Sequence, residues 1–465
     1  MCIFQYLVEK IDHTKTKNKI DMLEYLPQIL FILVLIAAVA FFAKNVSVLK
    51  RNINLGKDVN RNDQKDKRFK KMMKVALGQS KMVVRPIAGA LHIIVYVGFV
   101  IINIEVLEII IDGVVGTHRI FGFLGPVYNF LIGSFEILAF LVLVSVIVFW
   151  MRRNMLTIKR FLSKELKGWP KNDANYILYF EVVLMVLFLT MNATDLQLQQ
   201  LGASHYANEA GIVGAFPISQ YLLPLFEGLS VETLIILERT AWWLHIVGIL
   251  IFLNYLYYSK HLHILLAFPN VYFSNLNNLG TFKNLEAVTN EVKVMMDPNA
   301  DPFAEPEGED DDMPEKFGAS DVQDLNWFQL LSAYTCTECG RCTSECPASQ
   351  TGKKLSPRKI MMDTRDRLEE VGKHLNKKEE ITSDNQLLDN YITREELWAC
   401  TTCNACVDAC PVGIDPLSII MDMRQYLVME ESAAPSELNN AMSNIENNAA
   451  PWPYNQQDRL NWVNE

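Results

Sequence analysis

The sequence predicts an all-α protein, in which a five-span transmembrane helical bundle precedes a mostly helical cytoplasmic domain. Two observations lead to this fold class. Half of the 465 residues are hydrophobic and the mean hydropathy is +0.11, which is unusual for a purely soluble protein. Five apolar runs approach the length that spans a bilayer, and the C-terminal part has helical apolar spacing around two cysteine blocks. We expect an N-terminal segment, a membrane domain, an acidic linker, a cysteine domain and a partner-docking tail, at residues 1–24, 25–266, 267–325, 326–431 and 432–465.

The spans follow from length and hydropathy. The hydrocarbon core of a bilayer needs about 20 helical residues. The stretch 211–226 is weaker, because it contains Pro217 and Pro224, and we expect it to lie at the interface or to re-enter the membrane. The five expected spans are 25–43, 87–111, 127–151, 176–192 and 240–258.

Basic residues predict the orientation. Loop 44–85 contains 13 Lys and Arg residues and loop 152–171 contains seven, whereas loops 112–126 and 193–239 contain only Arg119 and Arg239. By the positive-inside rule, the basic loops and everything after the last span are cytoplasmic. The expected location is therefore a bacterial-type inner membrane, with the chain crossing it several times. The basic loops could instead bind nucleic acid, but contact with the lipid bilayer is favoured and no nucleic-acid partner is expected.

Four histidines in or beside the spans are candidate functional residues, because ionisable groups at membrane depth are costly. His245 and His263 are 18 residues apart, which is five turns of a continuous helix. We therefore expect them on one face of the last span, about 27 Å apart. Two imidazoles so placed suit two b-type haems, each completed by an imidazole from another helix. The further candidates are His92 on the second span and His118 before the third.

The five spans, the outside N-terminus and this histidine pair resemble the gamma subunit of respiratory nitrate reductase, a di-haem, quinol-oxidising cytochrome b. The resemblance implies two further haem ligands on the second span, where this sequence has only His92. We expect His92 to pair with His263, and His118 is the candidate partner of His245, so one or two b-type haems are expected. Histidines at the membrane interface without haem are the alternative.

Four carboxylates also lie in or near the spans, where they could carry protons to a quinone. Glu105 and Glu108 are expected nearer the outer side, and Glu181 nearer the inner side. Glu136 completes the set. A carboxylate bonded to a neighbouring helix is the alternative for each, and the sequence does not select a quinone site among them.

Residues 297–316, DPNADPFAEPEGEDDDMPEK, are rich in proline and acidic residues. This composition predicts a flexible linker.

The C-terminal domain contains one cysteine pattern twice, as CTECGRCTSECP at 336–347 and CTTCNACVDACP at 400–411. The spacing C-x2-C-x2-C-x3-C-P is the signature of bacterial two-cluster ferredoxins, in which the fourth cysteine serves the other cluster. Two zinc sites would leave the fourth cysteine and the proline unexplained, and disulfides are disfavoured in the cytoplasm. We therefore expect two [4Fe–4S] clusters. Their expected ligands are Cys336, Cys339, Cys342 and Cys410 for cluster 1, and Cys400, Cys403, Cys406 and Cys346 for cluster 2.

CTECGRC followed by LWACTTCNACVDACPVGIDP resembles the iron–sulfur subunits of heterodisulfide reductase and of anaerobic glycerol-3-phosphate and hydroxy-acid dehydrogenases, over about residues 317–430. With its membrane half, the chain resembles the fused cytochrome–ferredoxin proteins of the heterodisulfide-reductase-like class. Some of these pass electrons from electron-transfer flavoprotein to menaquinone. Many members also carry CCG repeats, and this chain has no CC pair. The resemblance therefore implies a partner with that domain, or a system without it.

The chain has no glycine-rich dinucleotide loop, no Walker A sequence and no hydrolase pattern. We therefore expect an electron-transfer subunit of a quinone-linked oxidoreductase complex, with no catalytic residue assigned. Electrons would pass between a soluble cytoplasmic partner (a CCG-domain subunit, flavoprotein or dehydrogenase) and membrane quinone, expected to be menaquinone. The alternatives are a haem-free membrane-tethered ferredoxin and a redox-sensing or scaffold subunit. Trp452, Tyr454 and Trp462 make the tail a candidate docking segment.

Overall fold

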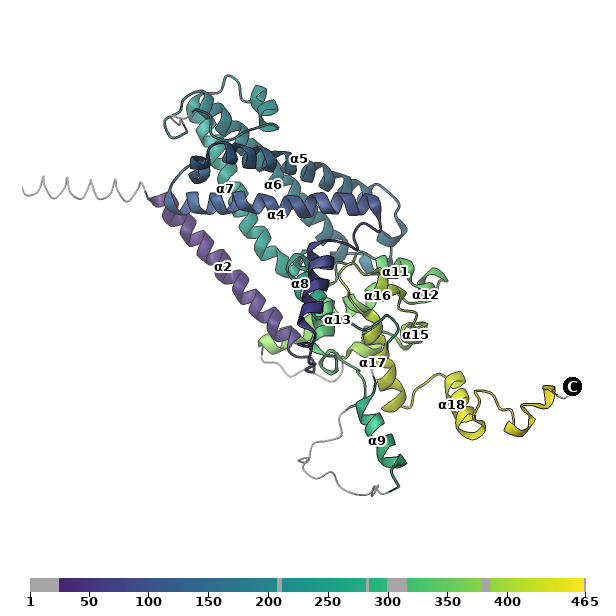
Figure 1. Cartoon of the computed structure of the whole chain (residues 1–465). Helices are drawn as coiled ribbons and strands as arrows, with labels where there is room; N and C mark the ends of the chain where they lie inside the picture. Colours follow the sequence, from purple (N-terminus) through teal and green to yellow (C-terminus); the bar gives the residue numbers. More distant parts are fainter. Residues whose placement is uncertain (1–24, 207–210, 282–283, 299–315, 378–384, 464–465) are drawn as a thin grey trace, which may run out of the picture. The chain divides into compact units, whose positions relative to one another are not determined.

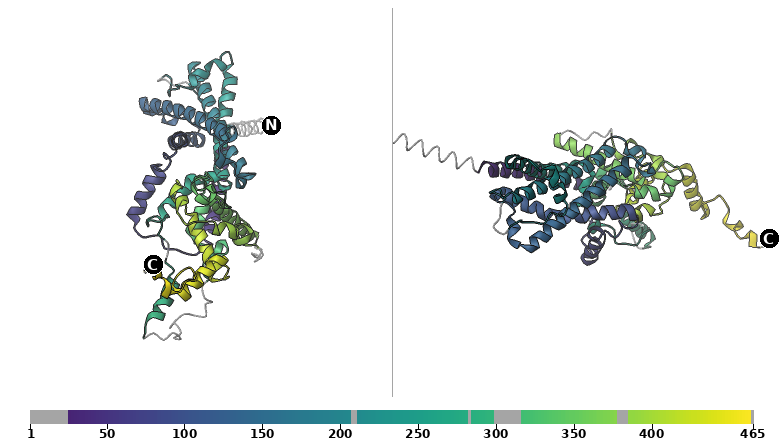
Figure 2. Two further views of the ribbon diagram at one scale, coloured as in Figure 1. Left: turned by 90° about the vertical axis from the view of Figure 1, so that its right-hand side faces the viewer. Right: turned by 90° about the horizontal axis from the view of Figure 1, so that it is seen from above.

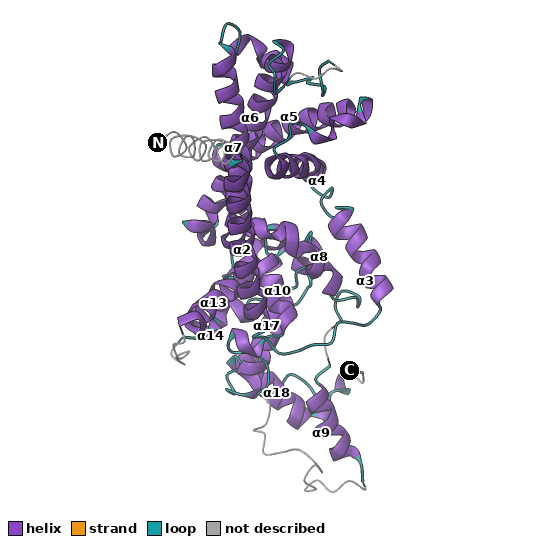
Figure 3. Ribbon diagram, turned by 90° about the vertical axis from the view of Figure 1, so that its left-hand side faces the viewer, coloured by secondary structure: helices purple, strands orange, loops and turns teal. Residues whose placement is uncertain are grey.

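The computed structural model describes residues 25–206, 211–281, 284–298, 316–377 and 385–463. The expected N-terminal segment 1–24 and nearly all of the expected flexible linker lie outside these residues. Within the described ranges every regular element is a helix, as the sequence predicts, and Figure 3 shows no strand there.

Five helices are long and apolar enough to cross a membrane, which confirms the five expected spans. Each helix is longer than its apolar run, because polar residues extend it at one or both ends. A proline lies at the first or second position of four of them, where its missing N–H costs nothing. The five helices, labelled in Figure 1, are α2 (Leu26–Ile53), α4 (Pro86–Val115), α5 (Pro126–Asn154), α6 (Trp169–Gln200) and α7 (Val231–Tyr255).

The chain divides into two compact units. Unit 1 contains the chain up to Arg51 together with Lys70–Pro269. Unit 2 contains Asn52–Phe69 and Asn270–Glu465. Part of the first loop between spans therefore folds with the C-terminal domain, although hydropathy alone assigns it to the membrane domain.

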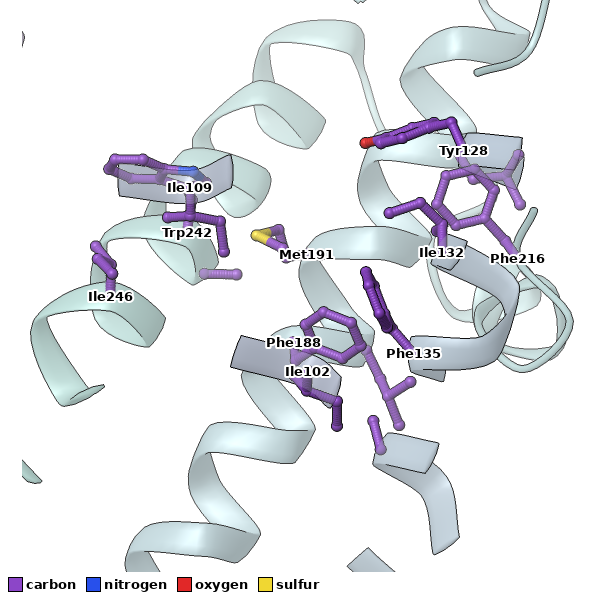
Figure 4. Packing of buried hydrophobic residues seen from close by; sticks show 14 of the residues in the cluster. Ile102, Ile109, Tyr128, Ile132, Phe135, Phe188, Met191, Phe216, Trp242 and Ile246 are labelled. Atoms are coloured by element: carbon purple, nitrogen blue, oxygen red, sulfur yellow. The ribbon is translucent and has the colours of Figure 1, made fainter. Parts of the chain in front are cut away.

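Unit 1 is built around α4, α5, α6 and α7, each of which packs on the next (Figures 1 and 2). Its core is a continuous apolar cluster in which Ile132 and Phe188 are completely buried (Figure 4). Gly98 of α4 lets the two backbones approach, because a Cβ atom at this position would lie 2.5 Å from the Val142 side chain of α5. α2 joins the cluster through Phe31, whose ring lies 5.5 Å from that of Trp242.

The stretch 211–226 does not form a span. It folds as a short 3-10 helix, η5 (Ser219–Leu225). Glu136 of α5 accepts hydrogen bonds from the backbone N–H groups of Ile218 and Ser219, at 2.9 and 3.1 Å. A buried carboxylate therefore holds this loop against the ends of the spans.

The last span does not continue as one helix to His263, so the expectation that His245 and His263 share a helix face is wrong. α7 is followed by η6 (Leu256–Tyr258), and Ser259 then adopts an extended conformation, with φ −118° and ψ 147°. The Ser259 hydroxyl accepts from the His261 N–H at 3.1 Å and so begins a new turn. The break is followed by η7 (Lys260–Leu262) and α8 (His263–Phe273).

Unit 2 is formed by short helices around the cysteine loops. Its loop 52–69 is tied to the C-terminal domain by backbone hydrogen bonds in both directions between Lys57 and the Leu325–Trp327 segment, at 2.8 and 3.0 Å. Gly56 is required there, because a Cβ atom would meet that backbone at 2.7 Å. The remaining α-helices of the described chain are α3 (Lys65–Met72), α9 (Glu286–Met296), α10 (Trp327–Thr335), α11 (Arg341–Glu345), α12 (Pro347–Gln350), α13 (Pro357–Lys377), α14 (Leu387–Asn390), α15 (Arg394–Trp398), α16 (Ala405–Ala409), α17 (Pro416–Met429) and α18 (Ser436–Asn448).

Candidate functional site

The two cysteine blocks adopt the same local conformation. In the first block, Glu338 and Gly340 have positive φ angles of 55° and 71°, and the equivalent Thr402 and Asn404 of the second block have 56° and 61°. Each loop then enters a five-residue helix, α11 or α16, and these two helices pack together. A positive φ angle costs free energy for any residue other than glycine. Its repetition at the same two positions of both blocks therefore indicates a loop conformation that is required by the function of the cysteines.

The fourth cysteine of the second block lies with the first block. One cavity is lined by Cys336, Cys339 and Cys342, and by Cys406 and Cys410 from the other block. The Ile414 N–H donates to the Cys410 sulfur at 3.3 Å. The structure thus brings Cys410 to the three cysteines with which the sequence groups it.

The fourth cysteine of the first block lies near the second block in turn. Burial raises the pKa of the Cys400 thiol, and the neighbouring Cys346 and Cys403 raise it further. The same two cysteines also raise the pKa of the Cys406 thiol, after burial, Asp415 and Cys400. Cys403 is exposed, whereas Cys346 and Cys406 are buried.

The surroundings of these thiols are suited to the binding of iron. All eight cysteines of the two blocks are free of disulfides. Burial raises the pKa of Cys336 to about 12 and also raises the pKa values of Cys342, Cys400 and Cys406, so these four bare thiols are held neutral. A bound cation reverses this, because a coordinating thiol is deprotonated. In the described residues no three Cys, His, Asp or Glu side chains converge as they would around one ion. Two blocks of four spread thiols suit a multi-iron cluster.

Two buried arginines, which sequence reasoning missed, also line the cavity of the first block. Arg358 of α13 is fully buried and Arg341 of α11 is 6% exposed. Buried guanidinium groups require compensating negative charge. No periodicity signals Arg358, because it approaches the cysteines only through the packing of α11 and α13, whereas Arg341 lies within the first block, next to Cys342.

Three histidines gather at the end of unit 1 where α7 ends. The ring centroids of His261 and His263 lie 5.4 Å apart, and the His263 Nδ1 lies 3.0 Å from the Lys260 carbonyl oxygen. Burial lowers the pKa of His261 to about 3, with further contributions from His263 and His92. The break at Ser259 brings His261 into this group, although a continuous helix would place it on the opposite face.

His245 lies apart from these three, within α7. It is 1% exposed, and its Nδ1 lies 3.0 Å from the Leu184 carbonyl oxygen. A backbone bond at Nδ1 leaves Nε2 as the nitrogen available to a ligand, which is the usual arrangement in imidazoles that bind a metal.

His118 contacts a buried carboxylate at the opposite end of unit 1. Its Nε2 lies 3.0 Å from Oδ1 of Asp195, and Arg119 donates to the other oxygen of the same carboxylate at 2.6 Å. Burial alone would lower the pKa of Arg119, but the Asp195 carboxylate more than offsets this and raises it. Since Asp195 lies against Nε2, His118 does not resemble His245 as a ligand.

The four carboxylates singled out in the sequence have different surroundings. Glu108 accepts from the Tyr128 hydroxyl and the Phe121 N–H at 2.8 and 2.9 Å, and Glu136 is likewise bonded. Glu181 lies 3.9 Å from His261. Glu105 is buried, and its Oε2 has no hydrogen-bond partner.

Comparison with known proteins supports iron–sulfur clusters. Residues 332–414 match the family model of a 4Fe-4S dicluster domain. The chain is similar to "Probable iron-sulfur-binding oxidoreductase FadF" of Bacillus subtilis, with 30% identity over 94% of this chain and 61% of the relative. It is also similar to "EtfAB:quinone oxidoreductase" of Syntrophomonas wolfei, with 26% identity over 88% of this chain and 55% of the relative.

A subunit of a heterodisulfide reductase is similar to a shorter part of this chain. One of the subunits of the dihydromethanophenazine:CoB–CoM heterodisulfide reductase of Methanosarcina mazei is 27% identical over 32% of this chain and 37% of the relative. This chain thus spans 61% and 55% of the two relatives that it matches almost throughout. No solved structure matches. By name the relatives are oxidoreductases or reductases, one of them iron–sulfur-binding. In this chain the match to a 4Fe–4S dicluster domain is joined to five helices able to span a membrane.

Proposed function

We propose that this chain is a membrane-anchored electron-transfer subunit, which connects a soluble cytoplasmic flavoprotein or dehydrogenase with membrane quinone through two [4Fe–4S] clusters and b-type haem. The observation that carries the proposal is the exchange of the fourth cysteines between two loops of the same conformation, in a chain that also contains a bundle of helices able to span a membrane. The name of the Syntrophomonas relative, which joins an electron-transfer flavoprotein to quinone, supports both ends of this path.

The cluster ligands follow from the grouping of the thiols. Cluster 1 takes four of the five cysteines that line one cavity. The fifth, Cys406, goes to cluster 2, because its thiol also interacts with those of Cys400, Cys346 and Cys403. Because Cys403 is exposed, cluster 2 is the one that a soluble partner approaches. The sets are Cys336, Cys339, Cys342 and Cys410, and Cys400, Cys403, Cys406 and Cys346.

The proposal also includes b-type haem, held by histidines of unit 1. His245 and His263 each have Nδ1 at a backbone carbonyl, so their Nε2 atoms are suited to iron. His92 and His261 are the candidates for a second ligand beside His263. When bound, b-type haem supplies a one-electron centre within the membrane, between one-electron clusters and a two-electron quinone.

The cluster domain is proposed to face the cytoplasm. Loop 52–69 and the C-terminal domain fold as one unit, so they lie on the same side of the membrane. The two arginines at the other end of the spans are both ion-paired, Arg119 with Asp195 and Arg239 with Glu238.

A fluorescent protein fused after Glu465 is therefore expected to fluoresce in a bacterial host, and an alkaline phosphatase fusion to be inactive. The reverse pattern would contradict the orientation.

Serine substitutions test the exchange of the fourth cysteines. We expect Cys410→Ser and Cys339→Ser to abolish the same cluster signal in electron paramagnetic resonance of the reduced protein, and to lower iron from about eight to about four atoms per chain. Cys346→Ser and Cys403→Ser form the matched pair and are expected to remove the other signal. If Cys410→Ser and Cys403→Ser remove the same signal, the exchange is wrong.

Arg358 provides a test of cluster 1 that does not depend on turnover. A buried positive charge stabilises the reduced, more negative cluster, so Arg358→Gln is expected to lower the midpoint potential of cluster 1 by about 60 mV, a tenfold change in the one-electron equilibrium. Redox titration followed by paramagnetic resonance measures this potential. Arg394→Gln, which removes an exposed arginine paired with Asp389, is the control and should leave both potentials unchanged. An equal shift of both clusters would contradict the assignment.

Optical spectra test the haem. The purified full chain is expected to give the reduced-minus-oxidised bands of b-type haem, and His245→Ala to lower the haem-to-protein ratio by about half or more, because an axial ligand is lost. His205→Ala replaces a histidine outside the spans and should retain the wild-type ratio. A wild-type protein with full iron content and no haem bands would favour the membrane-tethered ferredoxin instead.

A further inference from the structure

A cavity lies within unit 1 at the end of the spans opposite the His261–His263 pair. It is bounded by the C-terminal half of α4, the first half of α7, the end of α6 and the loop that contains His118 and Arg119. One part of its wall is apolar, formed by Ile109, Met191 and Trp242. A concave site with an apolar wall and a few convergent polar groups is the usual form of a small-molecule site.

Glu105 distinguishes this cavity from a structural polar network. The neighbouring Glu108 has both carboxylate oxygens hydrogen-bonded, and Asp195 is paired with Arg119. Glu105 lines the same cavity and is 3% exposed, yet its Oε2 has no hydrogen-bond partner. An unpaired buried carboxylate is costly, so Glu105 holds a proton or bonds to a ligand that the cavity takes.

The charged residues that line the cavity restrict the kind of ligand that it can bind. Five carboxylates line the cavity against two guanidinium groups and the His118 imidazole, so an anionic ligand is repelled. A neutral ligand that accepts hydrogen bonds from Arg119 or His118 and stacks on Trp242 fits both the polar and the apolar parts. The head group of a quinone has two carbonyl acceptors, a flat ring and no charge.

The cavity also lies near His245, because residues that line it share one face of α7 with this histidine. Glu238, Trp242 and His245 are at positions i, i+4 and i+7 of α7 and therefore share one face. Glu238 and Trp242 line the cavity, and His245 follows one turn deeper, about 4.5 Å further along the axis. A lipid-soluble ligand could reach the cavity past α2, because only 6% of the α2 span is buried.

Resting on the proposed function, we infer that this cavity binds the head group of the membrane quinone and that Glu105 transfers a proton to it. Reduction of the quinone to quinol consumes two electrons and two protons. The electrons come from the reduced soluble donor through the redox centres of the chain. The Glu105 carboxyl gives one proton to a quinone oxygen and regains one from water at this end of the bundle, and the second proton follows the same route.

The first experiment locates the quinone. The full-length protein in nanodiscs is illuminated with a short-chain azidonaphthoquinone, and the labelled peptides are identified by mass spectrometry. We expect label in the peptides that contain Ile109, Met191 or Trp242, and loss of this label with excess unmodified naphthoquinone. Label confined to peptides elsewhere would overturn the site, including the case in which the cavity carries only protons.

The second experiment measures the role of Glu105. The protein is reduced under anaerobic conditions and mixed with naphthoquinone, and reoxidation is followed by visible absorbance. Glu105→Gln is expected to slow quinone-dependent reoxidation by about 100-fold, the usual contribution of a proton-transferring group. Its iron content and reoxidation by ferricyanide should be unchanged. Glu232→Gln, the matched control with an exposed carboxylate of α7 that does not line the cavity, is expected to remain within about twofold of wild type.

The outcomes separate this inference from the proposed function. A wild-type rate in Glu105→Gln, or an equal loss in Glu232→Gln, overturns the role of Glu105. If wild type is labelled in the cavity but is never reoxidised by quinone, the site stands and the electron-transfer function fails. If wild type is neither labelled nor reoxidised, both fail.

Discussion

The burial of thiol groups in the two cysteine blocks is the constraint on which unit 2 depends. In apolar surroundings a thiol stays neutral, and burial raises the pKa of Cys336 to about 12. Only a positively charged partner makes thiolates stable there, and iron supplies that charge. The loops also contain three non-glycine residues with positive φ, Glu338, Thr402 and Asn404, whose strain needs compensation. Folding of these loops and assembly of the clusters are therefore expected to be coupled.

Unit 1 must also satisfy buried groups, which here are charged side chains and not thiols. Its interior contains carboxylates and guanidinium groups where water is scarce, and nearly all are satisfied in pairs. Arg119 bonds to Asp195, Asn192 and Tyr128, and Glu136 bonds to the backbone of the loop that follows α6. These bonds fix the loops at one end of the spans. The Oε2 atom of Glu105 takes no part in them, so its burial is not explained by the need to hold the bundle together.

The sequence predicts the parts of this protein that depend on local pattern. Spans follow from hydropathy and length, and the eight cysteines follow from spacing, because both signals lie within one segment. The break in the last span is not predicted, because no glycine or proline marks it and apolar residues resume shortly after Ser259. Its signals are weak ones: a serine at the new N-terminal cap and Asp173, far away in sequence, which accepts from Lys260 and Tyr255. His261 joins His263 only because of that break.

Contacts between distant segments could not be predicted in the same way. Arg119 and Asp195 are 76 residues apart, and neither lies in a motif. In the sequence the basic loop after α2 gives only a charge signal for orientation, but Gly56, Lys57 and Trp327 show that it is also part of the fold of unit 2. This second role strengthens the first. A loop that must pack with the cluster domain cannot lie on the other side of the membrane from it, so the charge of the loop and the place of the clusters are fixed together.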